Sequence, residues 1–261
     1  MLGAIVGDII GSRFEFQPLK SCDFELFTSA CRFTDDTVLT LATANALLKQ
    51  QPFGECYHTF YQRYPEAGYG QGFSRWALSG TKLPYNSYGN GSAMRVAPVA
   101  WVAKQLDEVL DLAAQSALPT HDHPEGIKGA QAVAAAIFLA RSGTGKAAIR
   151  DYVTERFGYD LQRPLDQIRP AYGFEVSCQK SVPEALCCFF ESSDFVSSIR
   201  LAVSLGGDAD TQAAIAGSVA EAFYGGVPPA ILKNARGYLD PFLLGLCDEF
   251  RMRYLTQYIS A

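Results

Sequence analysis

The sequence predicts an all-α fold in which many helices pack in one domain that spans residues 1–261. Apolar residues recur at spacings of three and four along most segments, and strict alternation over strand lengths is scarce. The chain shows no long linker, no low-complexity tract and no fixed-period repeat. Its 261 residues lie at the upper end of the size of one compact domain. These observations predict a single helical core.

The individual helices follow from this periodicity, and the first is a stretch of small residues before Glu15. In chain order, the others are expected over residues 38–49, 55–64, 93–104, 106–118, 129–141, 147–156, 182–191, 195–205 and 213–224. Those over 38–49, 93–104, 129–141 and 213–224 are rich in small residues. Alanine favours helix and lets helix axes approach closely.

Glycine and proline interrupt the helical pattern at several places. Glycine-rich segments cover residues 68–72, 88–92 and 206–208, where backbone is expected to approach another group closely. In the C-terminal part, the interruptions are Pro228, Pro229, Gly237 and Pro241.

Composition and charge exclude several classes of protein. Apolar residues make up 48% of the chain and charged residues 19%, which is typical of a globular protein with a large core. The net charge of -5 gives no basic footprint for non-specific nucleic-acid binding. No apolar run approaches the roughly 18 residues of a membrane span, and none resembles a secretory signal. The seven cysteines show no C-x-x-C spacing, so we expect neither a disulfide framework nor a cysteine zinc site. We therefore expect the protein to be in a reducing cytoplasm.

Several common motifs of nucleotide-binding and hydrolytic enzymes do not occur. The G-x-G segments that begin at Gly70 and Gly89 lack the third glycine of the dinucleotide fingerprint. The histidines are His58, His121 and His123, with no H-E-x-x-H motif, and G-x-S-x-G is absent. The sequence therefore gives no support for a Rossmann cofactor site, a zinc protease or an α/β-hydrolase.

Two acidic segments stand directly before expected helices. Thr34-Asp35-Asp36-Thr37 precedes the helix over 38–49, and Gly207-Asp208-Ala209-Asp210-Thr211 precedes the helix over 213–224. One interpretation is capping, because Asp and Thr satisfy the free N–H groups of a helix start and complement its dipole. Capping needs one side chain, whereas each segment offers two carboxylates together with hydroxyl oxygens. The repeated surplus favours a binding site.

If the two helix starts converge, four carboxylates meet and repel one another unless they are protonated or neutralised. The donors are hard oxygens without thiol or imidazole, which favours Mg²⁺, Mn²⁺ or Ca²⁺ over zinc. The charges suit two divalent ions, since four carboxylates balance two such cations. A calcium loop of the EF-hand type is excluded, because the later glycine and glutamate positions are missing.

Other polar residues have two possible interpretations each. Glu15 is either a solvated loop carboxylate or a third acid of the site, and Asp8 is interpreted as structural. His121 and His123 lie near a helix start, which modestly favours a polar site there. The segment over residues 86–92 combines glycines, hydroxyls and amides before a helix, which is typical of a phosphate cradle but also of an ordinary polar turn.

These segments resemble the ADP-ribosylglycohydrolase family, which includes dinitrogenase reductase-activating glycohydrolase and J1-crystallin. The resemblance covers nearly the whole chain: G-D-I-I-G-S-x-x-E ends at Glu15, T-D-D-T begins at Thr34, Y-G-N-G-S-A-M-R begins at Tyr88, T-H ends at His121, and G-D-A-D-T ends at Thr211. The order and spacing of the motifs match the family. Ala209 stands where the family has a bulkier residue, at a position that is not a ligand.

The resemblance implies an all-α orthogonal bundle with two Mg²⁺ ions, or Mn²⁺, in a cleft for ADP-ribose. The metal ligands implied by the motifs are Thr34, Asp35, Asp36, Asp208, Asp210 and Thr211. Glu15 matches a mobile acid, and Glu15 or Asp36 would accept a proton. The substrate-binding positions are Gly72, Asn86, Ser87, Tyr88, Gly89, Asn90 and His121, whereas His123 has no counterpart.

The activity implied is metal-dependent hydrolysis of the glycosidic bond between ADP-ribose and a modified protein side chain, with arginine favoured over serine. The transition state would resemble an oxocarbenium ion, and an acidified water would attack the anomeric carbon. The partners expected are an ADP-ribosylated protein and ADP-ribose. Two alternatives stay open: a catalytically silent ADP-ribose-binding or structural, crystallin-like protein, and a dimetal phosphohydrolase that would release AMP.

Overall fold

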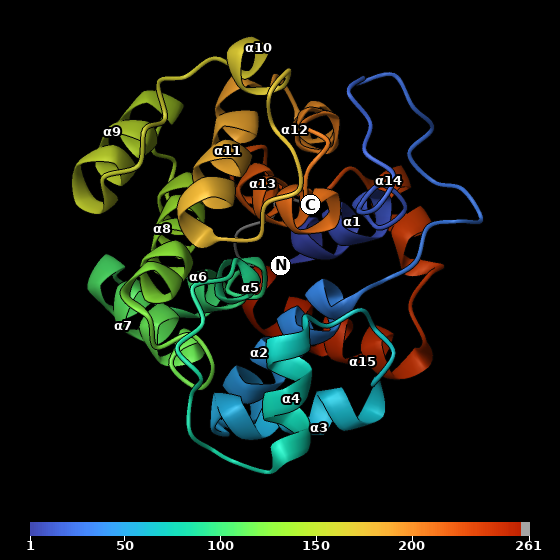
Figure 1. Ribbon diagram of the computed structural model, residues 1–261, viewed down its shortest axis with the longest axis vertical. Coiled ribbons are helices and arrows are strands. Elements are labelled where there is room, and N and C mark those ends of the chain that lie inside the picture. The colour runs from blue at the N-terminus through green and yellow to red at the C-terminus, as the bar shows by residue number, and fades with distance from the viewer. Residues whose placement is uncertain (257–261) are drawn as a thin grey trace.

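The computed structural model describes residues 1–256, and every regular element among them is a helix (Figure 1). Within that range the backbone forms no strand, and Gly89 and Ser177 form an isolated antiparallel bridge. The all-α prediction is therefore confirmed. No helix among these residues is long and apolar enough to cross a membrane.

The helices have the following bounds in chain order: α1 (Leu2–Gly11), α2 (Asp35–Lys49), α3 (Phe53–Arg63), α4 (Gln71–Ser79), α5 (Gly91–Met94), α6 (Val99–Val102), α7 (Leu106–Ala117), α8 (Pro124–Arg141), α9 (Lys146–Phe157), α10 (Leu165–Ile168), α11 (Cys178–Glu191), α12 (Phe195–Ser204), α13 (Ala209–Phe223), α14 (Pro229–Arg236), α15 (Pro241–Phe250) and the π-helical turn η1 (Arg251–Leu255).

The predicted helices are confirmed except for the one over 93–104. That segment forms two short helices, α5 and α6, with a break that ends at Pro98. Proline has no N–H to donate and restricts the residue before it, so one continuous helix was the wrong expectation. Helices α4, α10, α14 and α15 were not predicted. Pro229 and Pro241 are the first residues of α14 and α15, where proline is favoured rather than disruptive.

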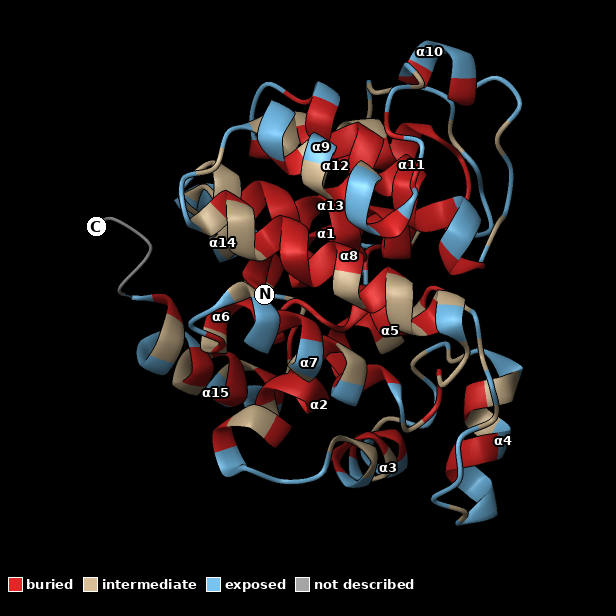
Figure 2. Cartoon of the chain, turned by 90° about the vertical axis from the view of Figure 1, so that its left-hand side faces the viewer, coloured by how far each residue is buried: buried red, intermediate tan, exposed pale blue. Residues whose placement is uncertain are grey.

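Helices α1 and α13 form the centre of the core and run antiparallel. Every residue of α1 is buried, as is nearly all of α13 (Figure 2). Small residues repeat every four positions along both: a Cβ atom on Gly7 would lie 2.1 Å from the carbonyl oxygen of Ala213, and one on Gly11 would lie 2.5 Å from that of Ala209. The two backbones are therefore in direct contact, which only glycine on α1 permits.

This contact places the C-terminal end of α1 beside the N-terminal end of α13. Helices α8, α11 and α12 pack against α13, while α2, α3, α4 and α15 lie on the opposite side of the molecule from α9–α12 (Figures 1 and 2). The apolar side chains of both sides belong to one continuous core. The start of α2 reaches the same place as the start of α13, because α2 packs against α1 as well.

Candidate active site

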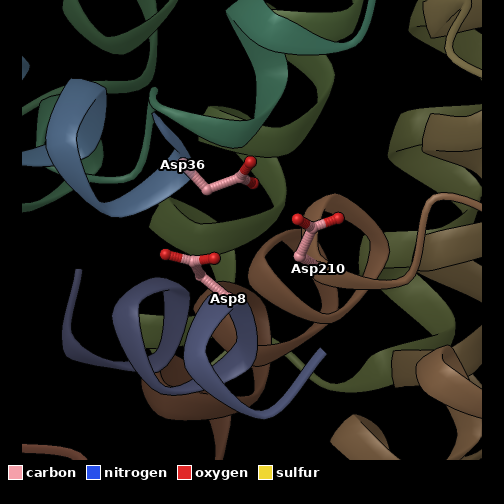
Figure 3. Close-up of side chains that lie close together, drawn as sticks. All are labelled: Asp8, Asp36 and Asp210. Carbon is pink, nitrogen blue, oxygen red and sulfur yellow. The ribbon is translucent and has the colours of Figure 1, made fainter. Parts of the chain in front are cut away.

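The two acidic helix starts converge, as predicted. The hydroxyl of Thr211 donates to Oδ2 of Asp36 over 3.3 Å, and both residues are buried. Carboxylate oxygens of Asp8, Asp36 and Asp210 all lie within 4.8 Å of one another, and the three side chains face a common point from α1, α2 and α13 (Figure 3). A second such group consists of Glu15, Asp208 and Asp210. Asp210 belongs to both groups.

Asp8 holds the start of α2 in place. Its Oδ1 accepts from the Thr34 hydroxyl at 2.7 Å, and its Oδ2 accepts from the backbone N–H groups of Thr34 and Thr37 at 2.9 and 3.1 Å and from the Thr37 hydroxyl. The carboxylate is fully buried. These hydrogen bonds agree with the interpretation of Asp8 as structural, since both of its oxygens are already engaged.

Capping accounts for only part of the acidic surplus. Thr34 is the N-cap of α2 and its hydroxyl accepts from the N–H of Asp36, so Asp35 and Asp36 are not needed as caps. Asp208 is the N-cap of α13 by position, yet its side chain makes no capping hydrogen bond. It accepts instead from the side-chain amide of Asn90 over 2.7 Å. Of these carboxylates, Asp210 accepts from a helix N–H, that of Thr211 over 3.0 Å, so capping uses only part of the cluster.

Burial and mutual repulsion raise the pKa of each carboxyl group in this cluster. The pKa values of Asp35, Asp36 and Asp210 lie well above their ordinary value, first because burial disfavours the charged form and then because each faces another aspartate. Burial raises the pKa of Asp208 to about 6. Burial and the charge of Asp210 raise the pKa of the half-buried Glu15 to about 8. Such a cluster requires protons or a bound cation.

The donor set fits divalent cations of the Mg²⁺ type. Among residues 1–256, none of the ion pairs involves a carboxylate of the cluster. Oδ1 of Asp36 is buried and accepts no hydrogen bond from the described chain. An unpartnered buried carboxylate oxygen is costly unless a cation or a donor meets it. All of the ligand atoms that the cluster offers to a metal are oxygens, which Mg²⁺ and Mn²⁺ prefer.

The carboxylates line the floor of a cleft of about 550 Å³, a volume typical of small-ligand sites. The predicted site residues in its lining are Glu15, Asp35, Asp36, Gly72, Ser87, Gly89, Asn90, His121, Asp208, Asp210 and Thr211. Three others lie outside the lining: Thr34 is the cap beneath it, Asn86 bonds to Asp122 through its N–H, and Tyr88 is exposed and packs edge-on against His123. Their roles in binding stay predictions.

Ser87, Gly89 and Asn90 form one wall of the cleft, and hydrogen bonds to the 176–178 segment hold this loop in place. The N–H of Asn90 donates to the carbonyl of Val176, and the N–H of Cys178 donates to that of Tyr88. The side-chain amide of Asn90 donates to Asp208 of the acidic cluster over 2.7 Å. This hydrogen bond fixes the position of the loop relative to the acidic cluster, which the sequence motifs alone do not show.

His121 lines the cleft beside this wall, with its ring against the glycines. A Cβ atom on Gly91 would lie 3.3 Å from its Nε2 atom, so glycine leaves room beside the ring. Burial and the positive charge of Arg95 lower the pKa of His121 well below its ordinary value. His123 does not share this environment: its Nδ1 accepts from the N–H of Glu125 and caps α8.

Sequence reasoning missed several residues of the lining. Phe16 and Phe174 are exposed at the rim, and their rings stack with centroids 5.9 Å apart. Tyr69, Tyr85 and Arg95 lie deeper. Arg95 ends the Y-G-N-G-S-A-M-R motif, so its position was a usable signal. Nothing in the sequence linked Phe16 to Phe174, because their contact depends on the tertiary fold.

Comparison with known proteins agrees with this arrangement. A model of the ADP-ribosylglycohydrolase family matches residues 1–258. Human ADP-ribosylhydrolase ARH3 is 27% identical over 94% of this chain and 90% of its own length. ADP-ribosylarginine hydrolase Tri1 of Pseudomonas putida is 29% identical over 88% of this chain and 71% of its own. The solved structure of an ADP-ribosylglycohydrolase-related protein complex is similar, with a TM-score of 0.73, 27% identity and 96% of each chain covered. The chain belongs to the ADP-ribosylglycohydrolase family.

Proposed function

We propose that this protein is a metal-dependent hydrolase that cleaves the glycosidic bond between ADP-ribose and a modified protein side chain. The observation that carries the proposal is the position of Asp210, whose carboxylate belongs to two groups of three acids on the floor of a nucleotide-sized cleft. Asp210 thereby lies within 4.8 Å of both Asp36 and Asp208, so its carboxylate can contact a cation beside either of them. Family membership supports the reaction class, since the relatives carry the names of ADP-ribosyl hydrolases.

The residues that would hold two Mg²⁺ or Mn²⁺ ions are Thr34, Asp35, Asp36, Asp208, Asp210 and Thr211. Four of them are carboxylates, whose charge two divalent cations balance. Asp8 would act behind them by fixing Thr34 and Thr37. When bound, the ions would supply positive charge that binds ribose hydroxyls and acidifies a water molecule.

Glu15 is the best placed proton acceptor in this proposal. Its carboxylate lies within 4.8 Å of Asp208 and Asp210 in the group defined above, yet it comes from a loop and is only half-buried. A carboxylate at this position can take a proton from an attacking water. Asp36 is the alternative acceptor, because its Oδ1 is unpartnered. The surrounding negative charge favours the positive charge that develops at the anomeric carbon.

The walls of the cleft support ADP-ribose as the bound group. The diphosphate would lie along the glycines of the 86–91 segment, where a Cβ atom on Gly89 would lie 3.3 Å from the hydroxyl of Ser87. Gly72 lets α4 approach the ring of Tyr85, because a Cβ atom on Gly72 would lie only 3.1 Å from that ring. Aromatic rings and close backbone provide stacking surface and N–H donors for a nucleotide.

We propose arginine rather than serine as the linked side chain. Tri1, which is similar over 88% of this chain, carries the name of an ADP-ribosylarginine hydrolase. A guanidinium group also suits the acidic floor of the cleft, because it is cationic and forms paired hydrogen bonds with carboxylates.

The seven free thiols support a reducing, cytoplasmic setting.

The test uses matched proteins that carry ADP-ribose on arginine or on serine, incubated with Mg²⁺ or with EDTA. We expect Mg²⁺-dependent release of ADP-ribose and an unmodified side chain, faster from arginine, as read by mass spectrometry. Release of AMP would overturn the proposal in favour of a phosphohydrolase. Binding of ADP-ribose without any release would support the silent or structural alternative instead.

A further inference from the structure

Three buried polar side chains, Arg95, Thr120 and His121, form a chain from the core to the wall of the cleft. Arg95 and Thr120 have no exposed surface, and His121 has 4%. The guanidinium of Arg95 lies 4.2 Å from the ring centroid of Tyr57. Its Nη2 donates to Oγ1 of Thr120 over 2.8 Å and to the carbonyl of Ser116 over 3.3 Å. No carboxylate pairs with Arg95 among the described residues.

The direction of each hydrogen bond among these three side chains follows from the chemistry of the groups. A guanidinium has only donors, so the Thr120 oxygen must accept from Arg95. The hydroxyl then has one hydrogen to donate, and a buried donor needs an acceptor. Nδ1 of His121 lies 2.7 Å away, and within residues 1–256 no other side-chain partner of Thr120 is present. Thr120 therefore donates to Nδ1, and the ring hydrogen of a neutral His121 is on Nε2.

We infer that Arg95 and Thr120 are positioning residues that fix His121 as its Nε2–H tautomer and present that N–H to an oxygen of the bound ligand. Nε2 faces the glycine wall, since a Cβ atom on Gly91 or Gly89 would lie 3.3 or 3.7 Å from it. No hydrogen bond from the described chain reaches Nε2, and His121 lines the cleft. The identity of the ligand as ADP-ribose rests on the proposed function, whereas the tautomer does not.

This arrangement limits what His121 does in the reaction. With a hydrogen on Nε2 and Nδ1 occupied by Thr120, the ring has no free lone pair for a proton. His121 therefore binds a ribose or phosphate oxygen as a donor and does not act as a general base. Proton transfer falls to the carboxylates of the acidic cluster.

The direct test is the histidine ¹⁵N NMR spectrum of the wild-type protein without ligand. The chain has three histidines, and the spectra of His58→Gln and His123→Gln assign the third signal. We expect His121 to show the Nε2–H pattern across pH 6 to 8. An Nδ1–H pattern, or an imidazolium, would overturn the inference whether or not ADP-ribose binds.

A matched pair of variants tests whether the hydrogen bonds from Arg95 through Thr120 to His121, here called the relay, set the tautomer. Thr120→Val keeps the shape and removes the hydroxyl, while Thr120→Ser keeps the hydroxyl. We expect mixed tautomers and about tenfold weaker ADP-ribose binding in the valine variant, because one oriented hydrogen bond is lost, and near wild-type behaviour in the serine variant. In Arg95→Met the Thr120 oxygen becomes free to accept a hydrogen bond from an Nδ1–H group of His121. Mixed tautomers of His121 are therefore expected again.

Three results separate the possible failures. A pure Nε2–H signal in folded Thr120→Val or Arg95→Met would show that the relay does not set the tautomer. If these variants do not fold, the wild-type spectrum alone decides. Wild-type protein that shows the Nε2–H pattern but does not bind ADP-ribose would contradict the proposed function and leave the assignment of the tautomer supported.

Discussion

The hydroxyl of Thr211 lies 3.3 Å from Oδ2 of Asp36, a contact between residues 175 positions apart in the chain. It joins the starts of α2 and α13, which both pack against α1. The glycines of α1 bring its backbone against α13, and Asp8, next to Gly7, bonds the start of α2. The position of the acidic cluster is thus determined by a stripe of small residues that carries no charge itself.

Replacement of Asp210 by asparagine is expected to stabilise the metal-free protein. A carboxyl group whose pKa is higher in the folded than in the unfolded state loses stabilising free energy as the pH rises through the folded pKa. For Asp208 and Glu15 this loss begins at their ordinary pKa values of 3.8 and 4.5 and extends to about 6 and about 8, and the raised pKa of Asp210 acts in the same direction. In EDTA at pH 8 we expect Asp210→Asn to unfold at a higher urea concentration than wild type. The difference should shrink at pH 5, and a less stable variant at pH 8 would contradict the repulsion argument.

Replacement of Asp8 by asparagine is expected to destabilise the fold. Four donors from Thr34 and Thr37 converge on Asp8, and the amide of asparagine would present N–H groups to some of them. The loss should be about 2–3 kcal/mol in the free energy of unfolding, because buried donors are left unsatisfied. Asp107→Asn on the exposed side of α7 is the control and should change stability little. Equal stability of the two variants would count against the structural role of Asp8.

Mg²⁺ and ADP-ribose are each expected to raise the melting temperature. A ligand that binds only the folded state adds about 2.7 kcal/mol at a hundredfold excess over its Kd, or roughly 5–10 °C for a chain of this size. Differential scanning fluorimetry measures the shift. Asp210→Asn should lose the response to Mg²⁺. A melting temperature that neither compound changes at saturating concentration would show that the cleft is not their binding site.

Replacement of Glu15 by glutamine is expected to lower kcat by about 100-fold or more while ADP-ribose binds with near wild-type affinity. The change keeps the shape and removes the proton acceptor, whereas the proposed diphosphate contacts are made by the 86–91 segment. Glu25→Gln, an exposed residue of the same loop, is the matched control and should keep full activity. Wild-type kcat in Glu15→Gln would leave Asp36 as the better candidate base.

The sequence was sufficient to predict the elements in which local and tertiary preferences agree. Residues 129–141 and 213–224 repeat small and apolar side chains with helical spacing, and α8 and α13 cover them. The convergence of the two acidic segments could be predicted because each has more carboxylates than a cap requires. Both inferences rest on residue chemistry within one short segment.

The remaining features depend on contacts between distant segments. Pro98 interrupts the helix expected over 93–104, whereas Pro229 and Pro241 are the first residues of helices. The presence of proline alone therefore does not indicate whether a helix starts or ends there. The burial of Arg95 against Tyr57, and its bond to Thr120, could not be inferred from spacing because three separate segments meet there. The same holds for the stacking of Phe16 on Phe174.

The central claim is that the two acidic helix starts form one metal centre, and calorimetric titration of the wild-type protein, Asp36→Asn and Asp210→Asn with Mg²⁺ tests it most directly. Because Asp210 belongs to both groups of acids and Asp36 to one, we predict two ions per wild-type chain, at least about tenfold weaker binding of both in Asp210→Asn, and of at least one in Asp36→Asn. Circular dichroism should show unchanged helix content in both variants. A variant of one helix start that still binds Mg²⁺ with wild-type stoichiometry and affinity would contradict the single centre.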